Sequence, residues 1–543
     1  MDGLMQDYPL TIDRLFRRAE DWFGHKSIVS VEPTREVVTS YRDWSAGTRR
    51  LAGALELLGI APDARIGSFA WNSARHLQLY FGVPGTGRVL HCINIRLSPE
   101  QVVFVINHAE DEAIFVDRSL VPVLGPLLSR CPTVRHVIVM EDAPGADDVL
   151  DGISAQVHRY DDLLAASPEG DMRVTDENSA AAMCYTSGTT GDPKGVVYSH
   201  RSVYLHTMAA SAVGTLGINE ADRVLPLVPM FHANAWGIPH AAVAQGADII
   251  LPGSDLSGPR VADLLVNHEV TMTAGVPTLW TAALPHLRDR DTSSLRLIAC
   301  GGAAVPVALS ESYRKQVGLP LQQAWGMTET SPLAAVGRLD RSHTELDEQV
   351  QADLRAGVGR ATLGVEARLV EPDTMNPVPH DGATTGELQV AGPWIAGGYY
   401  QGSGDDEGFT PDGWLRTGDV ATMDGRGWIR LVDRTKDLIK SGGEWISSVD
   451  LENELMNHAT VAEAAVVGVP HPRWTERPLA CVVPAAGAAV DTDQLMAHLA
   501  HRFPKWQLPE RIVVVDAIPK TSVGKFSKTQ LRAQYRDAFM VEG

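Results

Sequence analysis

A glycine- and hydroxyl-rich stretch between two apolar runs carries the most specific chemistry in this sequence. It extends from Tyr185 to Gly195 with the order Tyr-Thr-Ser-Gly-Thr-Thr-Gly-Asp-Pro-Lys-Gly, and strand-like residues 180–184 and 196–198 flank it. Glycines let the backbone turn tightly and bring N–H groups close to a phosphate, hydroxyls add donors, and Lys194 adds positive charge. The order differs from that of the P-loop, and no helix is expected to begin at the lysine. The stretch therefore predicts a phosphate-binding loop of another type.

Four further motifs follow this loop along the chain: Gln323–Thr330, Gly413–Asp419, Asp433–Trp445 and Pro519–Lys525. Together the five stretches resemble the signature motifs of the adenylate-forming enzymes, which include acyl-CoA synthetases, luciferases and the adenylation domains of peptide synthetases. The resemblance covers nearly the whole chain. It implies an acid–thiol ligase: a carboxylate and ATP give acyl-AMP and pyrophosphate, and coenzyme A then gives acyl-CoA and AMP.

Joining a carboxylate to the α-phosphate of ATP brings two anions together, so the protein must supply cations and positioning. The resemblance assigns Lys525 as the cation between carboxylate and α-phosphate, and Thr186 and Glu329 as the Mg²⁺ ligands; His232 completes the implied catalytic set. The implied nucleotide-binding residues are Thr186, Ser187, Gly188, Thr189, Thr190, Gly191, Lys194, Gly301, Gly302, Ala303, Trp325, Gly326, Met327, Thr328, Asp419, Arg434 and Lys440. Among these, Trp325 is expected to stack on adenine and Asp419 to accept hydrogen bonds from the ribose hydroxyls.

The acid is suggested by Pro229–Gly237, which resembles the Phe-His-x-Asn-x-Trp stretch of medium- and long-chain fatty-acyl-CoA synthetases. By this resemblance Trp236 gates an acyl tunnel and His232 lies against the substrate. The acyl-binding residues expected are His232, Trp236, Val276, Gly302, Pro332 and Leu333. The alternatives are a ligase for a short sulfur-containing or aryl acid, a stand-alone adenylating enzyme that loads a carrier protein, and a luciferase-type oxygenase.

The CoA step is assigned to residues around a hinge. The resemblance places Lys436 at the hinge and the Ser441, Gly442, Gly443 and Trp445 loop beside the pantetheine arm, so that rotation of a small domain would serve two half-reactions in turn. Relatives often carry Trp-Gly-Glu-Arg where this chain has Trp474-Thr-Glu-Arg477, which puts details of the CoA contact in doubt.

Alternating helix and strand patterns predict the α/β class. The expected fold is a large N-terminal domain, residues 1–433, made of two parallel-sheet α/β subdomains plus a small β-barrel, and a small mobile C-terminal α+β domain, residues 434–543. The hinge is expected near 433–437. Short strands with Gly-rich turns after Gly357 indicate the barrel.

Three local elements are predicted in more detail. The residues from Thr11 to Phe23 form an amphipathic pattern with Trp22 on the apolar face, and Thr11 is suited to cap its start. Ser98-Pro-Glu-Gln101 is a capping box that should open another helix. Within the weakly patterned residues 141–178, one short helix is expected at Tyr160–Ala166.

Composition narrows the class of partner. The chain has 543 residues and a net charge of −20, which argues against a nucleic-acid partner. Five scattered cysteines without metal-ligand spacing, an N-terminus unlike a signal peptide, and no apolar run near ~20 residues favour a cytoplasmic protein without a membrane span. Family resemblance alone suggests a homodimer.

Overall fold

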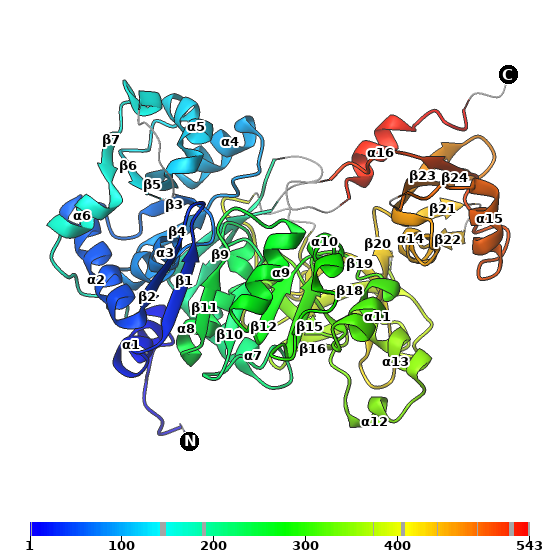
Figure 1. The fold of residues 1–543 in the computed structure, drawn as a ribbon, viewed down its shortest axis with the longest axis horizontal. Coiled ribbons are helices and arrows are strands. Elements are labelled where there is room, and N and C mark those ends of the chain that lie inside the picture. The colour runs from blue at the N-terminus through cyan, green and yellow to red at the C-terminus, as the bar shows by residue number, and fades with distance from the viewer. Residues whose placement is uncertain are drawn as a thin grey trace.

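The computed structural model describes residues 1, 3–141, 148–186, 192–372, 374–402, 408–441, 444–485, 487–520 and 526–540. Two large sheets form the body of the protein, a four-stranded sheet adjoins them, and a five-stranded sheet lies at the C-terminal end of the chain, at the right of Figure 1.

The first large sheet carries the start of the phosphate-loop motif. Its seven strands lie in the order β7 (Gln156–Arg159), β6 (His136–Met140), β5 (Asp111–Asp117), β3 (Arg65–Phe69), β4 (Val89–Cys92), β8 (Ala180–Tyr185) and β9 (Gly195–Ser199). All pairs are parallel except β8 with β9, which run antiparallel on either side of the loop. The loop therefore begins at the carboxyl end of a parallel strand, where ligands of open α/β sheets bind.

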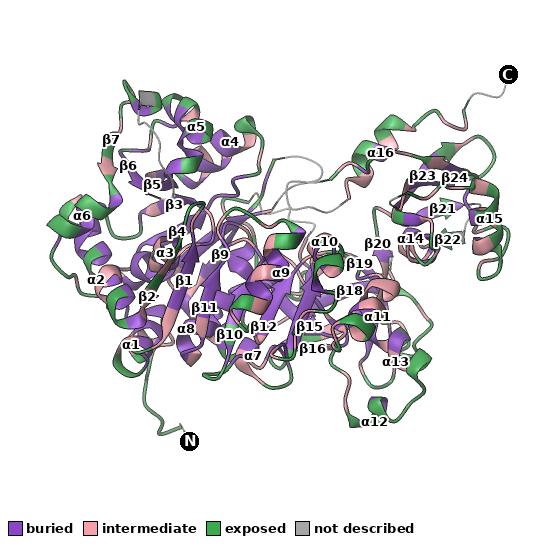
Figure 2. Ribbon diagram, viewed as in Figure 1, coloured by how far each residue is buried: buried purple, intermediate pink, exposed green. Residues whose placement is uncertain are grey.

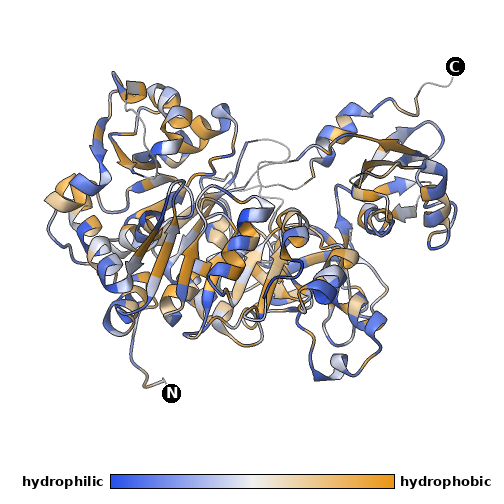
Figure 3. Ribbon diagram, in the orientation of Figure 1, coloured by the Kyte–Doolittle hydropathy of each residue, from blue (hydrophilic) through white to orange (hydrophobic). Residues whose placement is uncertain are grey.

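The second large sheet has nine strands. Their order is β16 (Arg360–Ala361), β15 (Leu333–Val336), β14 (Leu321–Gly326), β13 (Leu297–Gly301), β12 (Met272–Gly275), β10 (Arg223–Pro226), β11 (Asp248–Leu251), β1 (Ser27–Val31) and β2 (Glu36–Ser40). The strands from β14 to β1 are parallel, and the antiparallel strands β2, β15 and β16 lie at the two ends. Figure 2 shows these central strands buried, and Figure 3 shows them largely apolar, as a sheet covered on both faces requires.

Helices cover both sheets, and one apolar core joins them. That core contains Ile66 and Leu90 of the first sheet together with Val224 and Ile249 of the second. The covering helices are α1 (Ile12–Trp22), α2 (Tyr41–Leu57), α3 (Ala74–Gly85), α4 (Pro99–Ala109), α5 (Val121–Leu124), α6 (Tyr160–Ala166), α7 (His200–Ser211), α8 (Ile238–Gln245), α9 (Gly258–Asn267), α10 (Pro277–Leu287), α11 (Val307–Gln316), α12 (Arg341–Thr344) and α13 (Glu348–Arg355). Five short 3₁₀ turns add η1 (Arg118–Leu120), η2 (Gly125–Arg130), η3 (Asp148–Leu150), η4 (Ala233–Gly237) and η5 (Thr328–Thr330).

Local predictions are mostly confirmed. The Ser98 capping box is present at the start of α4, and α6 begins and ends where the sequence predicts. Two predictions for α1 are wrong: Thr11 makes no side-chain cap, and Trp22 is 63% exposed. The Arg18 guanidinium lies 4.4 Å from the Trp22 ring centre, so this tryptophan packs against a charged neighbour on the surface.

The region expected to be a small barrel is an antiparallel sheet. Strands β17 (Glu366–Val370), β18 (Gly386–Ala391), β19 (Leu415–Met423) and β20 (Ile429–Arg434) pair in that order, and within the described ranges no ladder joins β17 to β20. The fold class is confirmed, but the closed barrel is corrected to an open sheet. An isolated bridge between Gly359 and Ile429 connects it to the edge of the nine-stranded sheet.

The C-terminal unit is built on a long hairpin. Strands β23 (Val461–His471) and β24 (Thr475–Pro484) pair along their length, β21 (Ile439–Ser441) and β22 (Glu444–Ile446) extend the sheet on one side, and β25 (Arg511–Val514) runs parallel to β24. Helices α14 (Ser448–Met456), α15 (Thr492–Ala500) and α16 (Lys528–Gln534) complete it.

The residue that departs from the family pattern, Thr475, begins β24 directly after the hairpin turn. Thr475 has a φ of +70°, the left-handed conformation that favours glycine. The backbone therefore keeps a conformation that a glycine would adopt freely, and the β-branched threonine bears the strain.

Candidate active site

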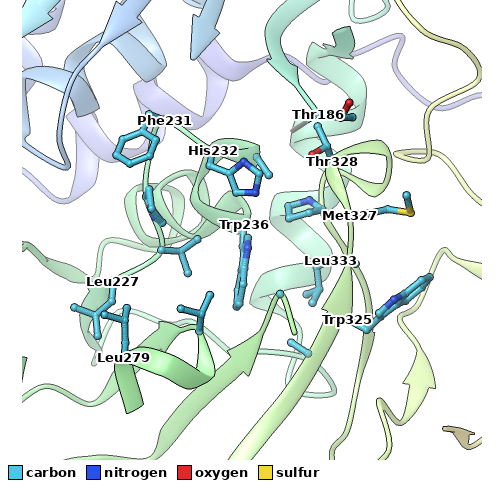
Figure 4. Close-up of a pocket in the computed structure, with 18 of the residues that line it drawn as sticks. Thr186, Leu227, Phe231, His232, Trp236, Leu279, Trp325, Met327, Thr328 and Leu333 are labelled. Atoms are coloured by element: carbon cyan, nitrogen blue, oxygen red, sulfur yellow. The ribbon is translucent and has the colours of Figure 1, made fainter. Parts of the chain in front are cut away.

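A cavity of about 350 Å³ lies where the two large sheets meet. Its walls come from segments far apart in the sequence: the residue after β8, the loop from β10 to η4, the start of α10, and the chain from β14 to β15. Thirteen of the predicted site residues line it: Thr186, His232, Trp236, Val276, Gly302, Trp325, Gly326, Met327, Thr328, Glu329, Pro332, Leu333 and Arg434. Figure 4 shows Thr186 and Thr328 at one part of the wall and Leu227 and Leu279 at another, with His232 and Trp236 between them.

The phosphate-loop motif is closed at its base by two hydrogen bonds between Thr186 and Lys194. The Thr186 N–H donates to the Lys194 carbonyl oxygen (2.9 Å), and the Lys194 N–H donates to Thr186 Oγ1 (3.2 Å). The Lys194 ammonium lies 4.6 Å from the Tyr399 ring centre, on a cation–π contact. The other predicted loop residues, Ser187, Gly188, Thr189, Thr190 and Gly191, lie outside the described residues.

Glu329 presents a carboxylate to the cavity from the short turn η5. Its side chain is 6% exposed, and its Oε1 accepts a hydrogen bond from the Tyr399 hydroxyl (2.7 Å). The same turn is held in place because the Tyr198 hydroxyl donates to the Thr328 carbonyl oxygen (2.7 Å). Glu329 and Thr186 thus bring one carboxylate and one hydroxyl, both hard oxygen ligands, to the same cavity. This donor set fits Mg²⁺, which takes few protein ligands and completes its shell with phosphate and water.

Trp325 and Asp419 are linked directly. The indole N–H of Trp325 donates to Asp419 Oδ2 (2.8 Å), while Asp419 Oδ1 pairs with Arg434 Nε (3.2 Å). Asp419 is 5% exposed and does not itself line the cavity, whereas its two partners do. Trp325, predicted to stack on adenine, and Asp419, predicted to bind ribose, are therefore joined by a hydrogen bond, and Arg434 completes the unit through its ion pair with Asp419.

The acyl motif adopts an unusual backbone. Five consecutive residues, from Ala233 to Gly237, have φ between +43° and +69°. L-residues adopt this conformation singly, at roughly 1–2 kcal/mol each, so the turn holds strain at the cavity wall. The Trp236 ring reaches Gly301: a Cβ on that glycine would lie 3.0 Å from Cη2 of the indole. Gly301 thereby makes room for the tryptophan.

A buried histidine fixes the opposite wall. The Leu333 N–H donates to His206 Nε2 (3.2 Å), and a Cβ on Gly237 would lie 2.5 Å from the His206 ring. Burial and the neighbouring His240 lower the pKa of His206 to about 3, so the ring is neutral and accepts this hydrogen bond. The same side chain thus contacts the end of the Trp236 turn and supports Leu333.

The three residues of the predicted Gly301-Gly302-Ala303 stretch lie in three different environments. Gly301 is buried in β13, Gly302 lines the cavity, and Ala303 lines a second cavity of about 300 Å³. The second cavity lies between α10 and α11 of the large sheets and Met456, Val461 and Phe526 of the C-terminal unit. Val276 and Thr278 line both cavities.

Of the predicted CoA and hinge residues, the three that the structure describes, Lys436, Ser441 and Trp445, do not line the first cavity. The Lys440 ammonium lies 5.3 Å from the Trp445 ring centre, across the hairpin of β21 and β22, and Ser441 Oγ accepts from Arg477 Nη1 (3.1 Å). Lys436 follows β20, and desolvation together with the nearby charge of Arg434 lowers its ammonium pKa. Gly442, Gly443 and Lys525 lie outside the described residues.

A buried ionic network holds the segment around the predicted hinge. Asp433 Oδ2 accepts from the N–H (2.7 Å) and hydroxyl (2.5 Å) of Ser448, and the Lys528 ammonium pairs with Glu452 (2.7 Å) beside them. Arg532 pairs with Asp437 (2.6 Å). Helix α16, which follows the Lys525 motif, is therefore tied to both ends of the predicted hinge.

Several wall residues were missed by the sequence predictions. Arg96, Leu227, Leu256, Thr278 and Leu279 line the first cavity, and Tyr399 bonds to Glu329. No motif signals them, because they come from loops and helix starts whose neighbours are set only by the fold.

The family model for AMP-binding enzymes matches residues 15–400, and the model for the AMP-binding enzyme C-terminal domain matches residues 450–525. The chain belongs to this family, which is part of the adenylate-forming superfamily, and the motif-based prediction of an AMP-forming acyl-CoA ligase is confirmed at that level. No helix in the described ranges is long and apolar enough to cross a membrane.

Individual relatives share the full length of the chain. It is 42% identical to 3-methylmercaptopropionyl-CoA ligase of Ruegeria lacuscaerulensis over 99% of both chains. It is 44% identical to the long-chain-fatty-acid–CoA ligase of Thermus thermophilus over 98% of this chain and 97% of that one. The crystal structure of ATP-bound MatB from Rhodopseudomonas palustris superposes with a TM-score of 0.81 at 25% identity, over 97% of this chain and 100% of that one.

Proposed function

We propose that this enzyme activates a medium- or long-chain fatty acid with ATP and transfers the acyl group to coenzyme A. The observation that carries the proposal is the single cavity into which a polar nucleotide wall and an apolar wall both open. Ligases for a short sulfur-containing acid and for a long-chain acid resemble this chain about equally, so identity does not decide the acid. The shape and chemistry of the apolar wall must do so.

The apolar wall supports an alkyl substrate. Leu227, Val228, Leu256, Val276 and Leu279 are its aliphatic members beyond Trp236. Such side chains recognise a substrate by burial of apolar area, about 0.8 kcal/mol for each CH₂ group. Each added methylene should therefore strengthen binding until the chain meets the end of the cavity.

In the first half-reaction, the carboxylate oxygen bonds to the α-phosphorus and the bond to the β-phosphate bridging oxygen breaks, which releases pyrophosphate. Trp325, Asp419 and Arg434 hold adenosine, and Thr186 and Lys194 hold the phosphates. Mg²⁺ held by Glu329 and Thr186 would neutralise charge on the phosphates. Lys525 supplies the cation aimed at the α-phosphate, and His232 orients the carboxylate.

In the second half-reaction, the CoA thiolate displaces AMP from the acyl carbon. The proposed large domain, 1–433, keeps the acyl-AMP while the small domain, 434–543, turns about Lys436 and replaces Lys525 with the Ser441–Gly443 loop. Lys440 and Trp445 would then approach the adenylate and the pantetheine arm. We also propose a homodimer in the cytoplasm, on family resemblance.

The test separates the two half-reactions with Lys525→Ala. Acyl-AMP formation from octanoate and ATP should be lost, whereas acyl-CoA formation from supplied octanoyl-AMP should remain, because Lys525 acts only on the α-phosphate. Mass spectrometry of both products measures the split, with Lys505→Ala as the matched control. Equal loss of both half-reactions would contradict the role of Lys525.

A further inference from the structure

The segment Trp394–Tyr400, which no predicted motif includes, runs between the two walls of the nucleotide site. At one end it is pinned to the turn that carries Glu329: the Ala396 N–H donates to the Glu329 carbonyl oxygen (2.7 Å), and Ser331 Oγ donates to the Trp394 carbonyl oxygen (2.7 Å). At the other end the Tyr400 N–H donates to the Gly195 carbonyl oxygen (2.8 Å), at the first residue of β9. The segment therefore fixes the distance between the Glu329 turn of one sheet and the phosphate-loop strand of the other.

Tyr399 stands where these two walls approach. Its hydroxyl donates to Glu329 Oε1 (2.7 Å), and its ring receives the Lys194 ammonium (4.6 Å to the centroid). The ring is itself packed edge-on against Phe409, with centroids 5.5 Å apart. One half-buried side chain thus contacts both the carboxylate and the lysine that the proposed function assigns to the Mg²⁺-bound phosphates.

We propose that Tyr399 is a positioning residue for metal-nucleotide binding, which acts through Glu329 and Lys194. The hydrogen bond from the phenol to Oε1 fixes the rotation of the Glu329 carboxylate, which would hold Mg²⁺. A hydrogen bond to an ionised carboxylate is among the stronger ones in proteins, and partners of metal ligands commonly set metal affinity by a factor of about 10–100. The cation–π contact with the ring positions the Lys194 ammonium. This inference rests on the proposed role of Glu329.

The hydroxyl and the ring make separable contributions. Tyr399→Phe removes the hydroxyl that bonds to Glu329 and keeps the ring face for Lys194, whereas Tyr399→Leu removes both the hydroxyl and the ring. Tyr400→Phe is the matched control, since it deletes the hydroxyl next along the chain, on a ring that packs against His108 instead.

The experiment is calorimetric titration of the full-length protein with ATP, once in EDTA and once in excess Mg²⁺. The ratio of the two dissociation constants measures the coupling between metal and nucleotide, independently of catalysis. We expect Tyr399→Phe to reduce this ratio about 10-fold with ATP affinity in EDTA unchanged. Tyr399→Leu should in addition weaken ATP binding in EDTA, and Tyr400→Phe should match the wild type.

Glu329→Gln makes the outcomes distinguishable. If Glu329→Gln reduces the ratio and Tyr399→Phe does not, the positioning role of Tyr399 is overturned while that of Glu329 stands. If neither variant changes the ratio, the metal role of Glu329 fails and this inference fails with it. The double variant should be no worse than Glu329→Gln alone, because the hydroxyl acts through that carboxylate; an additive loss would contradict the mechanism.

Discussion

Asp419 shows how one carboxylate can serve two neighbours at the nucleotide site. It is buried, it accepts from the Trp325 indole, and it pairs with Arg434. A ribose that binds to this carboxylate would join a network already oriented for it, because the tryptophan fixes one oxygen and the arginine the other.

Asp419→Asn tests this network. Asparagine keeps the size and can still accept from Trp325, but it loses the charge that pairs with Arg434 and strengthens hydrogen bonds to ribose. Hydrogen bonds to charged groups exceed neutral ones by roughly 1–2 kcal/mol, so the KM for ATP should rise about 5–30-fold with kcat less affected. Steady-state kinetics with saturating acid and CoA measure it. Trp325→Phe keeps the flat face and should shift KM less; an unchanged KM in Asp419→Asn would contradict the assignment to ribose.

Three packed helices carry a group of buried, neutral histidines. They are His76 on α3, His200 and His206 on α7, and His240 on α8, and each is at most 2% exposed. Burial lowers their pKa values to about 4 for His76, His200 and His240, and to about 3 for His206. Each contacts backbone or aromatic groups of the core; His200 Nδ1, for example, accepts from the Ile12 N–H (3.2 Å).

These lowered histidine pKa values predict that the protein becomes less stable as the pH falls. Below about pH 6.5 the unfolded histidines bind protons that the folded ones do not, so their contribution to stability is complete above that pH and is lost as the pH falls toward 4. Each contributes a slope of at most about 1.4 kcal/mol per pH unit. The melting temperature should therefore fall between pH 6.5 and 5, before most carboxylates titrate. His240→Gln should make that fall shallower, whereas a melting temperature flat down to pH 5 would contradict the effect.

Elements with a clear period or cap could be predicted from the sequence, and others could not. The Ser98 box and the short helix at Tyr160 have local signals, and both are found. The strand Gln156–Arg159 was missed because three of its four residues are exposed at a sheet edge, where no apolar alternation appears. The hairpin strands β23 and β24 extend into polar ends that cross-strand pairing holds and that no local apolar pattern signals.

The fold of the whole molecule brings residues from distant sequence motifs together around one cavity. Five motifs predicted the family and seven residues of the cavity wall, and the acyl-binding resemblance predicted six more, because those residues carry the chemistry itself. They did not predict Tyr399, Leu256 or Leu279, whose types are ordinary and whose places depend on how two sheets and a connecting segment meet. The left-handed turn at Trp236 also has no local signal, since only its last residue is glycine.

Because the whole chain has a net charge of −20, anionic ATP must be attracted by cations of the site itself. Arg96 and Arg434 line the cavity, and Lys194 lies at the Tyr399 ring beside it. Charges farther than about 8 Å are largely screened at physiological ionic strength, so these residues can attract ATP in spite of the acidic surface.

The first measurement to make is pyrophosphate release over a series of acids, from propionate and methylthiopropionate through octanoate to palmitate, with benzoate and cinnamate, each with and without CoA. The proposed function predicts turnover that CoA sustains and that rises with chain length up to the limit of the apolar wall. Pyrophosphate release that CoA does not sustain would instead indicate a carrier-protein acceptor. No release with any alkyl acid would contradict the fatty-acid assignment of the Trp236 cavity.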